Sequence, residues 1–369
     1  MNIDIIAGAR PNFVKIAPII KEIEKAASAG NNIQYRLIHT GQHYDQKMSN
    51  DFFKELEIPE PHLNLGANGG SQAEQTAAIM IGFERALLNN KAPDLVLVVG
   101  DVTSTMACSI VAKKLNIKLA HVEAGIRSFD LTMPEEINRM VTDSIADYFF
   151  TTSQSANANL VKAGIHDDRI YFVGNVMIDS LLKNSNRFIK PQIWNDAALK
   201  EKEYLVVTLH RPANVDLETR LQITLKEIAT AAQGLPIIFP VHPRTAKIMS
   251  KLMIEYSNLH LIEPLSYLEF NYLVKYAKGV ITDSGGITEE TTVMGVPCLT
   301  MRDNTERPET CSIGTNELIG TDIAAIKPNI DKLLSGKWKK GSIPELWDGN
   351  SAERIIKVLL ELHSKGGSN

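Results

Sequence analysis

The chain contains few cysteines and no excess of charge of one sign. Its 369 residues include three cysteines, Cys108, Cys298 and Cys311, and none of them forms a CxxC pair. A zinc site or a disulfide framework is therefore not expected. The formal net charge is −4, and no block of five or more like charges occurs. Because nucleic-acid binding needs a basic face, we expect no nucleic-acid partner.

Long apolar runs are also absent. No stretch approaches the roughly 18 uninterrupted apolar residues of a membrane span. The first residues, MNIDIIAGARP, lack the basic segment followed by an apolar run that marks a signal peptide. Hydrophobic residues make up 44% of the chain and charged residues 22%, which is typical of a globular protein. We expect a cytoplasmic protein without membrane insertion.

Short, almost wholly apolar runs alternate with amphipathic ones along the chain. Such runs suit strands that are buried on both faces of a parallel sheet, and their alternation with helices predicts an α/β fold. A mixed, polar stretch at 187–203 interrupts the series. The predicted strands cover residues 3–9, 35–40, 94–100, 118–123, 148–153 and 170–174 before this break, and 204–210, 236–242, 259–264, 279–285 and 297–301 after it.

The length of the chain exceeds what one hydrophobic core usually supports. We predict two Rossmann-like, doubly wound domains, over residues 1–175 and 176–350. A closing helix and tail over 351–369 are expected to pack back on the N-terminal domain. Doubly wound sheets bind ligands beyond the carboxyl ends of their strands, so a cleft that both domains face is the expected site.

The stretch DSGGITEE, residues 283–290, joins a predicted strand to a predicted helix. Glycines let backbone N–H groups approach an anion, and a helix N-terminus adds partial positive charge, which suits a phosphate. Glu289 or Glu290 could then bind the two hydroxyls of a ribose. A tight turn whose acids merely complement the helix dipole explains the same residues. Neither GxxxxGK[ST] nor GxGxxG occurs, which disfavours P-loop and NAD-binding interpretations.

Cationic and imidazole groups follow other predicted strands. In GARPNFVK, Arg10 and Lys15 could hold a diphosphate, although a surface turn is equally compatible with the pattern. His210 in TLHRPANVD and His242 in FPVHPRT each end a strand. Each histidine could contact a phosphate, act as an acid or base, or have a structural role.

Three acids of the first half, Asp101, Glu123 and Glu135, belong to one predicted sheet edge or its loops. Grouping and burial raise carboxyl pKa values, which is one way to obtain an acid and a base near neutral pH. Taken singly, two of these acids also fit a purely structural role. Asp101 could cap the helix that follows, and Glu135, like Glu136, could be an ordinary first-turn acid.

Together these motifs resemble the non-hydrolysing UDP-N-acetylglucosamine 2-epimerases. The resemblance implies a glycosyltransferase-B type fold, usually a homodimer. It also implies reversible inversion at C2 that converts UDP-GlcNAc to UDP-ManNAc for surface polysaccharides, with no cofactor and no metal. The matching motifs, in family order, are GARPNFVK, GQHYDQKMS, LVVGDVTST, AHVEAGIRSFD, MPEEINR, VGNVMID, TLHRPANVD, PVHPRT, TDSGGITEE and MRDNTERPET.

In the mechanism that the resemblance implies, UDP leaves C1 as the C2 proton is removed, which gives a 2-acetamidoglucal. UDP then re-adds, and C2 is protonated on the opposite face. The resemblance assigns catalysis to Asp101, Glu123, Glu135 and His210, the histidine stabilising the departing phosphate. It assigns substrate and UDP binding to Arg10, Lys15, His242, Ser284, Gly285, Gly286 and Glu290. Arg302 and Arg307 lie in a matching loop without an assigned role.

The sequence departs from the pattern of many bacterial members, which bind a second UDP-GlcNAc as an activator. Gln42 and Gln46 match that site, but Ser71 and Pro212 stand where arginines are expected, which argues against allosteric activation. The form TLHRPANVD is also similar to enzymes that epimerise UDP-2,3-diacetamido-glucuronic acid. A hydrolysing epimerase, a glycosyltransferase of the same fold and a non-catalytic nucleotide-sugar sensor remain alternatives.

Overall fold

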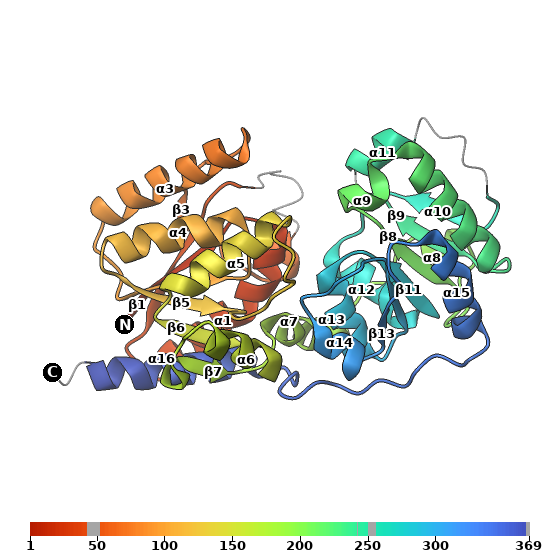
Figure 1. Ribbon diagram of the computed structural model, residues 1–369. Helices are drawn as coiled ribbons and strands as arrows, with labels where there is room; N and C mark the ends of the chain where they lie inside the picture. Colours follow the sequence, from red (N-terminus) through yellow and green to blue (C-terminus); the bar gives the residue numbers. More distant parts are fainter. Residues whose placement is uncertain (43–51, 242, 250–255, 367–369) are drawn as a thin grey trace. The chain divides into compact units, whose positions relative to one another are not determined.

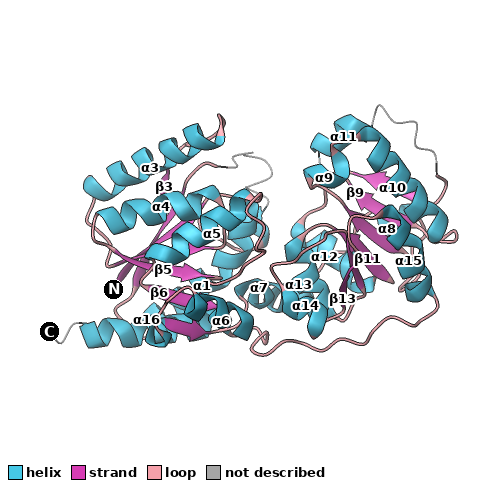
Figure 2. Ribbon diagram, in the orientation of Figure 1, coloured by secondary structure: helices cyan, strands magenta, loops and turns pink. Residues whose placement is uncertain are grey.

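The alternation of apolar strands and helices produces two parallel sheets, each with helices on both faces (Figure 1 and Figure 2). The computed structural model describes residues 1–42, 52–241, 243–249 and 256–366. The predicted α/β fold with two doubly wound domains is confirmed. The chain divides into an N-terminal unit, Met1–Lys183 with Glu345–Asn369, and a C-terminal unit, Asn184–Pro344.

The sheet of the N-terminal unit has seven strands in the order β3-β2-β1-β4-β5-β6-β7. The strands are β1 (Asn2–Ala7), β2 (Gln34–His39), β3 (Leu63–Asn64), β4 (Leu95–Val99), β5 (Lys118–Val122), β6 (Tyr148–Thr151) and β7 (Ile170–Phe172). The helices are α1 (Arg10–Ser28), α3 (Gln72–Leu88), α4 (Thr103–Lys114), α5 (Pro134–Ile145), α6 (Gln154–Lys162), α7 (Val176–Asn184) and α16 (Ser351–Gly366).

The sheet of the C-terminal unit has six strands in the order β10-β9-β8-β11-β12-β13. The strands are β8 (Leu205–Thr208), β9 (Ile237–Pro240), β10 (Leu259–Ile262), β11 (Gly279–Thr282), β12 (Cys298–Thr300) and β13 (Asn316–Leu318). The helices are α8 (Ile193–Asp196), α9 (Pro212–Val215), α10 (Glu218–Ala231), α11 (Pro243–Met249), α12 (Tyr267–Tyr276), α13 (Gly285–Met294), α14 (Pro308–Ser312) and α15 (Ile326–Leu334).

The central strands lie buried in the sheets because their residues are apolar. All five residues of β4, LVLVV, are buried, and so are Leu205, Val206 and Val207 of β8. A β-branched or leucine side chain that is removed from water on either face of a sheet contributes roughly 1.5–3 kcal/mol to the free energy of unfolding.

Among the described residues, no helix combines the length and the apolar character that crossing a membrane requires.

Each strand order reverses direction once. In the N-terminal sheet the reversal lies between β1 and β4, and in the C-terminal sheet it lies between β8 and β11. Loops on the two sides of such a switch point leave the sheet in opposite directions and open a crevice beyond the strand ends. The residues that follow β1, β4, β8 and β11 are therefore the first to consider for binding.

The end of the chain returns to the N-terminal unit. The indole of Trp347 is buried there, and its Nε1 donates to the carbonyl of Thr152 at 3.0 Å. The backbone N–H groups of Ser351 and Ala352, at the start of α16, donate to the carboxylate of Asp179. The helix α16 packs on α1. A buried aromatic side chain and a helix cap thus attach this segment.

Replacing Trp347 with alanine should therefore lower the free energy of unfolding of the N-terminal unit by about 3–5 kcal/mol, through lost burial and a cavity. Urea unfolding measures the change. The matched control is Leu88→Ala on α3, where the leucine is 67% exposed. A loss for Trp347→Ala no larger than for this control would contradict the role of the returning segment.

Candidate active site

The acids predicted from the sequence lie at the carboxyl ends of β4 and β5, next to the start of α1. The helix α1 begins at Arg10, Asp101 follows β4 by two residues, and Glu123 directly follows β5. Because β1, β4 and β5 are adjacent in the sheet, their ends bring these groups to one edge. The structure thus brings Arg10, Lys15, Asp101 and Glu123 into one region of the N-terminal unit.

A buried ion pair forms the centre of this region. Lys15 Nζ lies 2.6 Å from Glu123 Oε2, and the two side chains are 9% and 2% exposed. Glu123 has a φ of +68°, a left-handed conformation that is uncommon for a residue other than glycine and is often found at functional sites. A Cβ at Gly100 would lie 3.2 Å from Lys15 Nζ, so glycine at the end of β4 leaves room for the pair.

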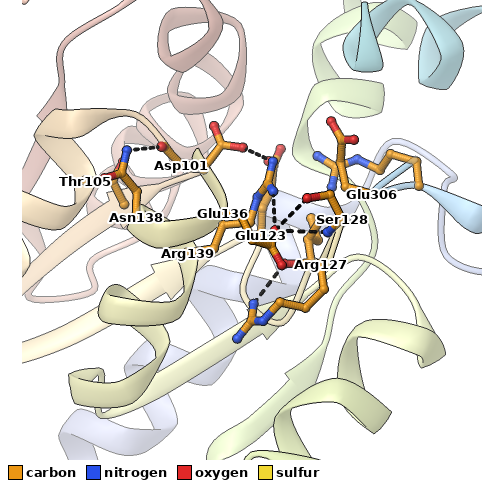
Figure 3. A network of polar contacts seen from close by, with 12 residues as sticks. Asp101, Thr105, Glu123, Arg127, Ser128, Glu136, Asn138, Arg139 and Glu306 are labelled. Atoms are coloured by element: carbon orange, nitrogen blue, oxygen red, sulfur yellow. Dashed lines mark hydrogen bonds and ion pairs between the residues drawn. The ribbon is translucent and has the colours of Figure 1, made fainter. Parts of the chain in front are cut away.

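Asp101 is held by α5. Arg139 Nη2 lies 2.5 Å from Asp101 Oδ2, and Asn138 Nδ2 donates to the Asp101 carbonyl at 2.8 Å (Figure 3). The side chain of Asp101 is 27% exposed, so a ligand can reach it. The residue that caps α4 is Val102. The capping role considered for Asp101 is therefore wrong, and the aspartate is kept in place by an arginine.

Glu135 and Glu136, which are adjacent in sequence, have different environments. Glu135 is exposed in the first turn of α5, whereas Glu136 is 1% exposed. Glu136 accepts hydrogen bonds from the backbone N–H groups of Ser128 and Phe129 and from Arg139 (Figure 3). Glu136 is thus more than a first-turn acid, because it fixes the loop that follows Glu123.

Other residues that the sequence analysis singled out in the N-terminal unit contact neighbouring side chains and backbone groups. The guanidinium of Arg10 lies over the ring of Phe52, with 4.3 Å between Cζ and the ring centroid. Gln42 Oε1 accepts from the backbone and side chain of Ser104. Ser71 caps α3, since its hydroxyl accepts from the Glu74 N–H and its own N–H donates to Glu74 Oε2. Gln46 lies outside the described residues.

The C-terminal unit contains a histidine–aspartate pair at its own switch point. His210 follows β8, and its Nδ1 lies 2.8 Å from Oδ1 of Asp283, which follows β11. Asp283 also accepts from the backbone N–H groups of His210 and Arg211 and from Asn214 Nδ2.

The environment of Asp283 determines which ring nitrogen of His210 carries a proton toward it. Burial raises the pKa of Asp283. The hydrogen bond and charge of His210, the side-chain hydrogen bond of Asn214 and the backbone hydrogen bond of Arg211 lower this pKa and leave it below its ordinary value. An ionised Asp283 accepts the Nδ1 proton of His210, so Nε2 is the nitrogen left for a ligand. The His210 side chain is 52% exposed. The sequence did not predict the role of Asp283, although this residue opens the stretch DSGG.

The stretch that was predicted to bind phosphate starts a helix. Ser284 is the N-cap of α13, and its side chain makes no capping hydrogen bond. The first N–H groups of a helix have no intrahelical acceptor and favour an anion. A Cβ at Gly285 would lie 2.7 Å from Glu306 Oε1, so the close approach of this carboxylate requires glycine. Gly286 follows in the first turn, and His242 lies outside the described residues.

Glu289 and Glu290 are both buried but have different partners. Glu289 pairs with Arg307 Nε, while Glu290 Oε1 accepts from the hydroxyl of Tyr267 at 2.9 Å. Burial raises the pKa of Glu290 to about 7, an effect that the Tyr267 hydrogen bond opposes. In the loop that carries Arg307, Arg302 pairs with Glu306 at 2.6 Å.

Comparison with known proteins gives consistent matches over nearly the whole chain. A family model described as UDP-N-acetylglucosamine 2-epimerase matches residues 25–360. A UDP-N-acetylglucosamine 2-epimerase of Methanocaldococcus jannaschii is 40% identical over 97% of this chain and 99% of its own. A UDP-2,3-diacetamido-2,3-dideoxy-D-glucuronate 2-epimerase of Pseudomonas aeruginosa is 37% identical over 98% of this chain and 100% of its own.

A solved structure gives the same result. The crystal structure of the Methanocaldococcus jannaschii UDP-GlcNAc 2-epimerase, in complex with UDP-GlcNAc and UDP, has a TM-score of 0.87 with this chain. The match covers 98% of this chain and 100% of that chain, at 40% identity. The similarity confirms the glycosyltransferase-B type of fold that the sequence resemblance implied.

The raised pKa of Glu290 predicts a pH-dependent stability. Between its ordinary pKa of 4.5 and about 7, folded Glu290 keeps a proton that the unfolded chain loses. Its contribution is thus fully present below pH 4.5 and is lost as the pH rises through 7. Glu290→Gln cannot ionise, so at pH 8 it should be more stable than the unchanged protein by on the order of 3 kcal/mol.

The gain should nearly vanish toward pH 4.5, and urea unfolding from pH 4.5 to 8 measures it. Glu263→Gln, at an exposed position, is the control and should leave the pH dependence unchanged. An equal stability difference between Glu290→Gln and the unchanged protein at every pH would contradict a buried, protonated Glu290.

Proposed function

Because the chain belongs to the UDP-N-acetylglucosamine 2-epimerase family, we propose that it interconverts UDP-GlcNAc and UDP-ManNAc by inversion at C2 of the sugar. The observation that carries the proposal is the buried Lys15–Glu123 pair beside Asp101. A buried carboxylate is costly unless it is compensated. A compensated carboxylate in a left-handed backbone conformation at the carboxyl end of β5, one strand from the switch point, is suited to move a proton.

The proposed reaction is an elimination followed by an addition. A carboxylate of the protein removes the C2 proton, the C1–C2 double bond forms, and the C1–O bond breaks so that its electron pair leaves with UDP. The diphosphate oxygen of UDP then attacks C1 of the 2-acetamidoglucal, and a carboxylic acid protonates C2 on the opposite face. This sequence needs a base and an acid near C2, and a cationic or hydrogen-bonding environment for the diphosphate.

We assign proton transfer to Asp101, Glu123 and Glu135 as a group. Lys15 compensates the charge of Glu123 and, with Arg10, supplies positive charge to the departing diphosphate. Because Asp283 holds the Nδ1 proton of His210, Nε2 can hydrogen-bond to a phosphate oxygen.

We assign UDP to the C-terminal unit. The N-terminus of α13, at Ser284, Gly285 and Gly286, suits the diphosphate, and Glu290 suits the ribose hydroxyls. Glu290 accepts from Tyr267 through one oxygen, and hydrogen bonds from ribose hydroxyls would favour its ionised form. His242 stays a predicted contact of UDP.

A modified UDP-sugar is the second candidate substrate. The Pseudomonas aeruginosa relative, named for UDP-2,3-diacetamido-2,3-dideoxy-D-glucuronate, favours it, at an identity only slightly below that of the Methanocaldococcus enzyme. The chemistry at C2 is unchanged, so the acids keep their roles. The second substrate has an acetamido group at C3 and a carboxylate at C6, and the carboxylate would require an additional cation.

The epimerase proposal predicts exchange of the C2 hydrogen with solvent. Incubation with UDP-GlcNAc in deuterated water should give UDP-ManNAc and place deuterium at C2 of both sugars, without an acceptor. Mass spectrometry and NMR spectroscopy measure both products. Free ManNAc with UDP would indicate a hydrolysing enzyme, and unlabelled substrate would rule out UDP-GlcNAc. A parallel incubation with UDP-2,3-diacetamido-glucuronic acid distinguishes the two candidate substrates.

Glu123→Gln should lower kcat by about 100-fold or more, since an amide neither accepts nor returns a proton. Its affinity for UDP should change much less than kcat, because the contacts proposed for UDP at the start of α13 do not involve Glu123. Glu84→Gln, an exposed residue of α3, is the control. Near-normal turnover of Glu123→Gln would remove Glu123 from the group of catalytic acids.

We further propose that the active form is a homodimer, as the family resemblance implies. The helices α3, α4 and α5 line an apolar groove of about 490 Å³, to which Met80, Met106 and Ile137 contribute. Ile81 and Met140, on α3 and α5, are about half exposed. Exposed apolar side chains around a groove suit the buried centre of an interface between two copies.

Ile137→Glu should therefore convert the dimer to a monomer, because it places a charge where a second copy would bury the isoleucine. Sedimentation velocity measures the change. Val161→Glu, at a similarly exposed position on α6, should leave the mass unchanged. A monomeric unchanged protein, or a dimer that tolerates Ile137→Glu, would refute this interface.

A further inference from the structure

The histidine of HVEAG, His121, occupies an unusual position beneath the acids. It lies on β5, two residues before Glu123, and its side chain is 0% exposed. Its Nδ1 lies 2.7 Å from Asp143 Oδ1 on α5, and its Nε2 lies 2.9 Å from the carbonyl oxygen of Gly100 at the end of β4. One imidazole therefore bridges three elements that position the acids.

Both partners of His121 are hydrogen-bond acceptors. A backbone carbonyl can only accept, so Nε2 carries a proton. Asp143 is ionised, because the guanidinium of Arg127 lies 2.6 Å from its Oδ2. The ionised carboxylate accepts the Nδ1 proton of His121, so the geometry favours an imidazolium with a proton on each nitrogen.

A second buried histidine shows the opposite arrangement. His39, 2% exposed at the end of β2, accepts the backbone N–H of Gly41 through Nδ1. That nitrogen has no proton, and burial lowers the pKa of His39. The difference between the two histidines therefore comes from their partners and not from burial alone.

We propose that His121 is a positioning residue that works as an imidazolium. Its bond to Gly100 fixes the turn that carries Asp101, and its pair with Asp143 ties the last turn of α5 to β5. Asp143 also accepts the N–H of Gly125 at 3.1 Å, two residues after Glu123, and pairs with Arg127 at 2.6 Å. His121 thus sets the relative placement of Asp101, Glu123 and α5, and adds a positive charge beneath the acids.

The proposal has a direct spectroscopic test that requires no substitution. With ¹⁵N-labelled histidine in the full chain at pH 7, one buried ring should carry both N–H protons, in slow exchange with solvent. His39 should show one protonated nitrogen in the same spectra. A neutral, single-tautomer ring for every buried histidine at pH 7 would overturn the proposal.

Kinetics test the positioning role, which rests on the proposed function of the acids. His121→Gln should lower kcat by about tenfold or more, because the acids lose their fixed separation, and UDP affinity should stay within about twofold. Loss of the positive charge favours protonated carboxyls, so the acidic limb of the kcat profile should move to higher pH. His166→Gln, which changes an exposed histidine, is the control.

An unshifted pH profile with kcat within twofold of the unchanged protein would reject the positioning role. If His121→Gln does not fold, Asp143→Asn provides a second test of the proposal. In that variant, His121 should lose the imidazolium signature. A persistent imidazolium in that variant would contradict the pair. Absence of epimerase activity in the unchanged protein would instead refute the proposed function and leave the spectroscopic result standing.

Discussion

Ionised groups buried at the carboxyl ends of parallel strands must be compensated, and this constraint organises both units. In the N-terminal unit, Lys15 pairs with Glu123 and Arg139 pairs with Asp101, each within 2.6 Å. In the C-terminal unit, His210 pairs with Asp283, and several N–H groups donate to this carboxylate. A buried charge that lost its partner would be strongly unfavourable. The same contacts that keep the fold stable therefore keep the proposed catalytic groups in a defined geometry.

The sheet order explains why these groups meet. Strands that are neighbours in space but distant in sequence, such as β1 with β4 and β8 with β11, bring their ends together at a switch point. Short loops then lead into helices, so backbone N–H groups and acidic side chains share one edge. Glycine at position 100 and a left-handed glutamate at 123 show that close approach at this edge restricts the choice of residue.

Much of this was accessible from the sequence, for identifiable reasons. Short apolar runs such as LVLVV predicted the central strands, and strand ends predicted where Asp101, Glu123, His210 and Ser284 would lie. The edge strands β3 (LN) and β13 (NEL) were missed because they are short and contain no apolar run. The role of Glu136 in fixing the loop after Glu123 was not predicted. Adjacent helical residues point about 100° apart, and only packing shows which one turns inward. Asp283 and His121 were missed because their partners come from distant segments.

The attachment of the last segment has a consequence for how the protein is made. Trp347 and α16 belong to the unit that is synthesised first, yet they leave the ribosome after the whole C-terminal unit. Chains fold largely from the N-terminus during synthesis, but this unit stays without one of its buried aromatic side chains until about 160 further residues have been added. The C-terminal unit, which is continuous in sequence, can complete its core earlier. The order of synthesis and the order of completion are thus reversed, and the unit that contains the acids is finished only after the C-terminal unit has been synthesised.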